Sequence, residues 1–114
     1  MKALVFVEPG KMEIREVSRP VCERGGLLVK VETCGFCGSD LRTYRYGHSR
    51  VTPPWIIGHE IAGVVAELGE GVVGFLPGER VAVAPPVYCG TCYYCRQSVF
   101  YLCQNSPPAW GSLF

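Results

Sequence analysis

The segment VYCGTCYYCRQSVFYLCQ, residues 87–104, sets the organisation of this 114-residue chain, because it spaces four cysteines as C-x2-C-x2-C-x7-C. Two-residue spacers let a turning backbone aim successive sulfurs at one point, and a tetrahedral zinc ion takes four thiolates at about 2.3 Å. A site with four protein ligands keeps no open coordination position, so it stabilises a loop and does not activate a substrate. The pattern therefore predicts a structural zinc site whose ligands are Cys89, Cys92, Cys95 and Cys103.

The seven cysteines also allow other interpretations. Three disulfides and a spare thiol would suit a secreted chain, but the odd count and the close cluster favour a metal in a reducing compartment. A C-x2-C-x2-C run also opens ferredoxin motifs, which place the fourth cysteine after three residues and before a proline, whereas Cys103 comes after seven and precedes Gln104. We expect Cys22 to be a loop thiol and Cys34 a packed small residue, although Cys34 and Cys37 also form a C-x2-C pair.

Composition predicts one turn-rich, mostly β domain. The chain has 14 glycines and 9 prolines, well above their usual share of about 12% together. It carries 11 basic and 10 acidic residues without a basic stripe, so nucleic acid is not an expected partner. The first apolar run is short, and no segment approaches a membrane-spanning length of about 18 apolar residues. We therefore expect a cytoplasmic protein without an export signal or a membrane partner.

Alternating apolar and polar residues predict strands at 3–7, 12–17, 27–32, 61–68 and 80–84. We expect the first three strands to form an antiparallel meander. After them, Ser39 or Asp40 can cap a short helix that Gly47 ends. Pro85 and Pro86 then open a cysteine lobe of about residues 85–105.

A second group of metal-ligating residue types lies outside the cysteine lobe. Cys37 stands in CGFCGSD (34–40), and His59 and Glu60 stand in GHEIAGVV (58–65). A single histidine before a strand is more often packed or solvated than a ligand. In a sequence that also contains Cys37 and a zinc-type cysteine cluster, the metal-ligand interpretation of His59 is favoured, because one cysteine and one histidine supply two ligands of a catalytic zinc site. Such a site needs a third protein ligand and an open position.

These motifs, together with PGERVAV (77–83) and the cysteine cluster, resemble in their order the zinc-containing medium-chain dehydrogenase/reductase family, which includes alcohol, sorbitol and threonine dehydrogenases. The resemblance implies that residues 1–114 form the family's GroES-like catalytic domain, a partly open, mostly β barrel with a short helix and a protruding zinc-binding lobe. It implies that Cys37 and His59 bind a catalytic zinc, that Glu60 is an outer-sphere or exchanging ligand, and that the four cysteines of the lobe bind the structural zinc.

The same resemblance implies oxidation of a small-molecule alcohol with NAD(P). Zinc polarises the alcohol oxygen and lowers its pKa, and Ser39 could pass the proton outward because a serine is too weak a base to keep it. The family often has histidine where this chain has Arg42, which cannot accept a proton at neutral pH and puts a relay through that position in doubt. The third zinc ligand and the Rossmann domain that binds NAD(P) are expected from positions beyond residue 114, so the chain is expected to be inactive alone.

Several alternatives remain at this stage. A non-catalytic zinc-binding scaffold competes with the dehydrogenase interpretation, and the discriminating feature is whether Cys37 and His59 bind metal. Tyr44, Tyr46 and Trp55 could line a substrate pocket or belong to the core. The resemblance suggests a homo-oligomer, and the apolar tail with Trp110, Leu113 and Phe114 could contribute to pairing or pack on the core.

Overall fold

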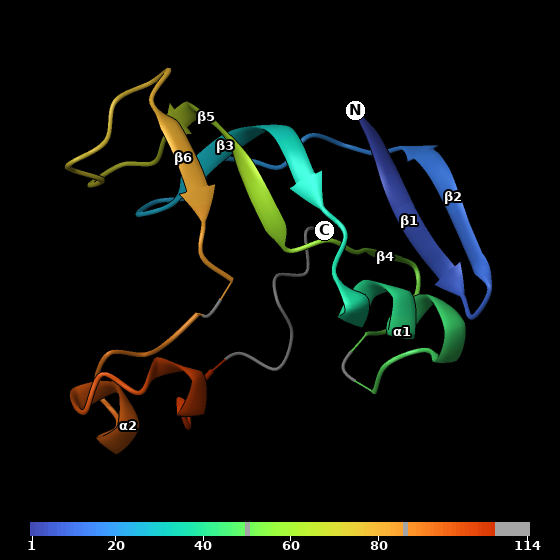
Figure 1. Ribbon diagram of the computed structural model, residues 1–114. Helices are drawn as coiled ribbons and strands as arrows, with labels where there is room; N and C mark the ends of the chain where they lie inside the picture. The colour runs from blue at the N-terminus through green and yellow to red at the C-terminus, as the bar shows by residue number, and fades with distance from the viewer. Residues whose placement is uncertain (50, 86, 107–114) are drawn as a thin grey trace.

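The computed structural model describes residues 1–49, 51–85 and 87–106, and it confirms the prediction of a mostly β chain (Figure 1). In these residues the elements follow one another as β1 (Lys2–Glu8), β2 (Lys11–Glu16), β3 (Leu27–Gly35), α1 (Gly38–Tyr46), β4 (Trp55–Ile56), β5 (Glu60–Leu68), β6 (Arg80–Val83), α2 (Tyr93–Arg96) and a 3-10 turn η1 (Phe100–Leu102). The strands form two antiparallel three-stranded sheets, in the orders β2-β1-β4 and β3-β5-β6.

The first sheet is centred on β1, whose residues Val5 and Phe6 are buried. Successive residues of a strand point to opposite faces, so the middle of β1 is covered on both sides. β4 pairs with the same two positions, Val5 with Ile56 and Phe6 with Trp55. This pairing holds the start of the segment that leads to His59.

The second sheet corrects one expectation, because β3 pairs with β5 and not with β2. The linker before β3 does not turn back along β2. Instead, its Gly25 N–H donates to the Glu70 carbonyl at 3.0 Å, and the Gly69 N–H donates to the Gly26 carbonyl at 2.9 Å. These bonds attach the start of β3 to the end of β5. Alternation predicted the strands correctly, but it carries no information about which strand is the partner.

The cap of α1 differs from the expected one. The N-cap residue is Cys37, not Ser39 or Asp40. Asp40 is the third helical residue, and its Oδ2 accepts a hydrogen bond from the Cys37 backbone N–H at 3.0 Å. A carboxylate at this position satisfies an otherwise unpaired donor at the start of the helix. The predicted end at Gly47 is confirmed, with a φ of 73° that glycine adopts without steric cost.

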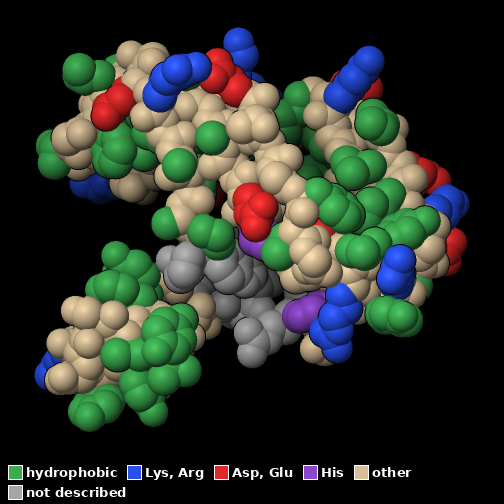
Figure 2. All heavy atoms as spheres, in the orientation of Figure 1, with side chains coloured by type: hydrophobic (Ala, Val, Ile, Leu, Met, Phe, Trp, Pro, Cys, Tyr) green, Lys and Arg blue, Asp and Glu red, His purple; other side chains and the backbone are tan. Residues whose placement is uncertain are grey.

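The cysteine lobe, with α2 and η1, stands apart from both sheets (Figure 1). Its surface carries many apolar side chains (Figure 2), including Tyr93 and Tyr101. Across the described residues, the buried apolar side chains are Val5, Phe6, Val65 and Cys95. The hydrophobic core is therefore small, and local interactions must stabilise the lobe.

In the part of the chain that the structure describes, no helix is long and apolar enough to cross a membrane. The expectations for Trp110, Leu113 and Phe114 concern residues outside the described ranges.

Candidate metal centres

The structure brings the four cysteines of the lobe into one cluster. One sulfur from each of Cys89, Cys92, Cys95 and Cys103 lies within 4.8 Å of all the others. The Cys89 and Cys95 sulfurs are 3.9 Å apart, close to the ~3.8 Å edge of a tetrahedron whose corners lie 2.3 Å from a central zinc. All seven cysteines are free thiols. The donor set and its spacing therefore fit a zinc ion.

Local backbone geometry explains how the lobe gathers these sulfurs. Gly90 has a φ of 72°, which turns the chain sharply after Cys89. The Cys92 N–H then points back at the Cys89 sulfur, with N and Sγ 3.4 Å apart. From the other arm of the lobe, the Cys103 sulfur accepts the Cys89 N–H at 3.3 Å. The two arms of the lobe are thus held side by side at the cluster.

Hydrogen bonding and burial give the thiols of the lobe different pKa values. A hydrogen bond from the Thr91 hydroxyl, supported by backbone N–H groups, lowers the pKa of Cys89 to about 5. Backbone N–H groups lower the pKa of Cys92, whereas burial raises the pKa of Cys95 to about 12. The thiolate is the form that binds metal. Cys89 and Cys92 are therefore the sulfurs that the lobe best prepares for a cation.

The second cluster forms where β3 ends and β5 begins. In an antiparallel pair the last residue of one strand faces the first residue of the other, and Gly35 of β3 faces Glu60 of β5. Cys37 follows β3 by two residues and His59 precedes β5 by one, so both reach the same end of the sheet. The ligand atoms of Cys37, His59 and Glu60 lie within 4.8 Å of one another. One thiolate, one imidazole and one carboxylate at this spacing fit a second zinc ion.

Gly35 makes room for this second cluster. A Cβ built on Gly35 would clash with the Glu60 carboxylate and would lie only 3.0 Å from the Glu60 Cβ. Glu60 is solvent-exposed, whereas Cys37 and His59 are half-buried. The missing side chain at Gly35 therefore lets the exposed carboxylate lie over the strand pair, beside the other two candidate ligands.

Asp40, which was expected only as a helix cap, lies beside this centre. Asp40 is 5% exposed, and its Oδ1 lies 3.5 Å from His59 Nδ1. Its other oxygen accepts the Cys37 N–H. A carboxylate on one imidazole nitrogen orients the ring and leaves the second nitrogen for a metal. One buried carboxylate thus contacts both of the two best candidate ligands.

The remaining candidates from the sequence lie at or near the surface. Ser39 and Arg42 are exposed on α1, and Tyr46 is exposed rather than part of the core. Cys22 is a loop thiol as expected, with its sulfur 3.7 Å from the Gly26 carbonyl oxygen. The expectation that Cys34 is packed was wrong, because the outer end of β3 is exposed.

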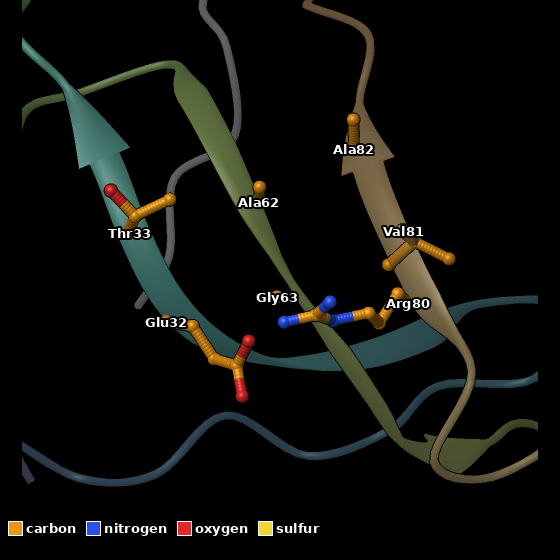
Figure 3. A pocket seen from close by; sticks show the side chains of 7 residues that line it. All are labelled: Glu32, Thr33, Ala62, Gly63, Arg80, Val81 and Ala82. Carbon is orange, nitrogen blue, oxygen red and sulfur yellow. The ribbon is translucent and has the colours of Figure 1, made fainter.

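A separate cavity of about 380 Å³ lies on the sheet formed by β3, β5 and β6 (Figure 3). In this view the Arg80 side chain extends across Gly63 towards the strand that carries Glu32. The lining consists of Glu32, Thr33, Ala62, Gly63, Arg80, Val81 and Ala82. This cavity is lined by none of the candidate metal ligands, so it is distinct from both metal centres.

Comparison with known proteins identifies the family to which this chain is similar. Residues 23–113 match the family described as Alcohol dehydrogenase GroES-like domain. L-threonine 3-dehydrogenase of Pyrococcus horikoshii is 41% identical over 110 residues, which cover 93% of this chain and 32% of the relative. Sorbitol dehydrogenase of Bacillus subtilis is 38% identical over 120 residues, which cover 98% of this chain and 34% of the relative.

Solved structures show the same fold. An alcohol dehydrogenase from Thermus sp. ATN1 superposes with a TM-score of 0.85 at 35% identity, covering 100% of this chain and 33% of that one. A cobalt- and zinc-bound thermostable alcohol dehydrogenase from Pyrobaculum aerophilum gives a TM-score of 0.88 at 31% identity, covering 96% and 34%. The chain therefore spans about a third of the length of these proteins. It belongs to the alcohol dehydrogenase GroES-like domain family. The predicted GroES-like fold is confirmed, and so is the presence of a lobe whose four cysteines form one cluster.

Proposed function

We propose that this member of the GroES-like family is the metal-binding, catalytic part of a zinc- and NAD(P)-dependent alcohol or polyol dehydrogenase. The observation that carries the proposal is the meeting of Cys37, His59 and Glu60 at one end of the β3–β5 pair. The relatives named as threonine, sorbitol and alcohol dehydrogenases support the reaction class. The cobalt- and zinc-bound relative supports the choice of metal.

The residues of the second cluster have separate roles in this proposal. Cys37 and His59 hold the catalytic zinc, and Glu60 is the outer-sphere or exchanging ligand. Bound zinc supplies a Lewis acid that polarises an alcohol oxygen and lowers the pKa of its hydroxyl. Asp40 orients the His59 ring through Nδ1, as its 3.5 Å contact supports.

Proton release is assigned to Ser39. This residue lies on the first turn of α1, two positions after Cys37, and it is exposed to water. Its hydroxyl can accept a proton from the substrate side and give one to solvent, which is the relay that a weak base requires. Arg42 lies one turn further along the helix and is also exposed. Because a guanidinium cannot accept a proton, the route leads from Ser39 to water and not through Arg42.

The cysteine lobe has a structural role in the proposal. Four thiolates around one zinc leave no position for substrate, so the lobe stabilises its own fold and takes no part in hydride transfer. The complete reaction also requires a nicotinamide-binding unit and a third catalytic ligand outside these 114 residues. We therefore propose that the purified 114-residue chain binds zinc but does not oxidise alcohols.

Cobalt substitution tests the proposal, because Co²⁺ replaces Zn²⁺ and reports its ligands by absorption. The 114-residue chain and a Cys37→Ser variant are loaded with Co²⁺, then mixed with NAD(P) and either sorbitol, L-threonine or a simple secondary alcohol. We expect two cobalt sites with different spectra, loss of one of them in the variant, and no NAD(P)H formation by either protein. An unchanged spectrum in Cys37→Ser contradicts the catalytic site, and NAD(P)H formation by the chain alone contradicts its incompleteness.

A further inference from the structure

Non-cysteine side chains donate hydrogen bonds to the sulfur of Cys89. The Thr91 hydroxyl and the Asn105 side-chain amide each donate to Cys89 Sγ at 3.5 Å. The Cys92 backbone N–H donates to the same sulfur at 3.4 Å. Among the described residues of the lobe, the Thr91 and Asn105 side-chain donors therefore meet at the first cysteine of the cluster.

The charge of the lobe explains why these neutral donors matter. Four thiolates around a divalent ion leave a net charge of −2, and Arg96 is the one charged residue of the sequence between positions 85 and 105. The Arg96 Nε does not reach a sulfur in this arrangement but donates to the Thr91 carbonyl at 2.9 Å. Arg96 thus fixes the backbone of Thr91 while the Thr91 hydroxyl faces the sulfur. Hydrogen bonds to charged groups are shorter or stronger than neutral ones, so such donors offset part of the thiolate charge.

Thr91 and Asn105 reach the sulfur from opposite arms of the lobe. Thr91 lies between Cys89 and Cys92, whereas Asn105 follows Cys103 by two residues. The next residue after Asn105, Ser106, donates its hydroxyl to the Val87 carbonyl at 3.1 Å. The two arms are therefore joined by side-chain hydrogen bonds and by the stacked rings of Tyr88 and Phe100, whose centroids lie 4.2 Å apart. Cys95 is the buried apolar residue of the described lobe.

We propose that Thr91 and Asn105 are positioning residues of the lobe, whose hydrogen bonds to Cys89 Sγ hold that thiolate on a bound metal ion and slow the release of the metal. The proposal rests on the zinc-binding role given to the lobe under the proposed function. It adds two residues outside the four-cysteine ligand set. Partners of this kind typically change metal affinity by about 10- to 100-fold. Because both side chains are exposed to water, we expect about tenfold for each, at the lower end of that range.

The test measures zinc release from the 114-residue chain. All proteins carry Cys37→Ala, so that only the lobe retains metal, and a chromogenic chelator reports the rate at which zinc leaves. Thr91→Val and Asn105→Leu remove the donors at nearly constant side-chain volume. Thr91→Ser keeps the hydroxyl, and Gln104→Leu removes a neighbouring exposed side-chain amide, so both serve as matched controls.

We expect release about tenfold faster in the Val and Leu variants at positions 91 and 105, with the two controls close to the parent. A second readout uses Co²⁺ in place of zinc. Loss of a hydrogen bond raises the energy of the sulfur lone pairs, so the sulfur-to-cobalt charge-transfer band should move to longer wavelength in Thr91→Val and return in Thr91→Ser. A general loosening of the lobe would accelerate release without moving this band.

The outcomes separate the two proposals. Parent-like release rates in both Thr91→Val and Asn105→Leu overturn the inference, and so does faster release with an unmoved cobalt band. Faster release in Thr91→Ser as large as in Thr91→Val also overturns it. If either Thr91→Val or Asn105→Leu does not fold, the release rate and the cobalt band of the variant that does fold decide the test. A parent chain that holds no zinc in the lobe contradicts the proposed function itself and is recognised before any variant is compared.

Discussion

Removal of the Asp40 carboxylate should weaken both the fold and the candidate catalytic centre. This side chain is buried, accepts the Cys37 N–H at 3.0 Å, and lies 3.5 Å from His59 Nδ1. In Asp40→Ala the N–H at the start of α1 loses its acceptor, and the imidazole loses its contact with this carboxylate. In Asp40→Asn the amide oxygen can still accept the Cys37 N–H, but the negative charge beside His59 is gone.

The magnitudes follow from these two contacts. Loss of an N-terminal helix cap costs about 1 kcal/mol, and loss of a buried hydrogen bond to a charged group costs about 1.5–3 kcal/mol. The 3.5 Å contact with His59 is longer than a typical hydrogen bond. We therefore expect its loss to cost no more than the lower end of this range of free energies, about 1.5 kcal/mol. We expect Asp40→Ala to lower the free energy of unfolding of the metal-free chain by about 2–3 kcal/mol, and Asp40→Asn by about half as much. Zinc affinity at the Cys37 and His59 centre should fall by about 10- to 100-fold in Asp40→Ala.

Urea unfolding of the chelator-treated chain, followed by far-ultraviolet circular dichroism, gives the free energies. Competition with a chromogenic chelator gives the zinc affinity. Arg42→Ala, an exposed change on the same helix, is the control and should stay within about 0.5 kcal/mol of the native chain. The proposed role of Asp40 is wrong if Asp40→Ala unfolds like the control, or if its stability falls while its zinc affinity at this centre is native.

Three further predictions address the second cluster, the core and the cysteine lobe. Gly35→Ala should lower the free energy of unfolding by about 1–3 kcal/mol and displace the Glu60 carboxylate. Gly38→Ala is the control, because its Cβ would meet nothing within 4 Å, and it should be neutral or stabilising by up to about 1 kcal/mol. Equal unfolding midpoints in urea for the two variants would rule out the clash at Gly35. Phe6→Ala should cost about 3–5 kcal/mol because this side chain is 1% exposed in a small core, and a loss below about 1 kcal/mol in the same assay would show that β1 is not the centre of that core. Removal of metal by a chelator should abolish hydrogen-exchange protection in the cysteine lobe, where Cys95 is the buried apolar residue, and leave β5 protected; a lobe that stays protected would mean that metal does not stabilise it.

The sequence predicted most of the strands but not how they associate. The expected strands at 3–7 and 12–17 correspond to Lys2–Glu8 and Lys11–Glu16, because alternation of apolar and polar residues reports the two faces of a strand. β4 was missed, since two residues are too few to show a period. The partner of β3 could not be predicted either. It depends on close approaches such as that of Gly63, where a Cβ would collide with the Lys30 carbonyl.

The candidate site shows the same division between local signals and contacts in space. The spacing of the lobe cysteines is local, so their clustering could be expected from the sequence alone. The approach of Cys37 to His59 depends on the register of β3 with β5, and only the resemblance to a family indicated it. Asp40 was expected as a helix cap, and a carboxylate three residues after an N-cap is a recognisable capping pattern, but its place beside His59 was missed. Its contact with His59 arises only in the folded chain.

The zinc content of the purified 114-residue chain, measured by elemental analysis and compared with that of Cys37→Ala, decides whether the proposed second metal centre exists. We expect close to two zinc ions per native chain and close to one per variant chain, because Cys37 and His59 form a centre separate from the four-cysteine cluster. About one zinc ion in both proteins would contradict it, since metal would then occupy only the cysteine lobe and the second cluster would not bind zinc.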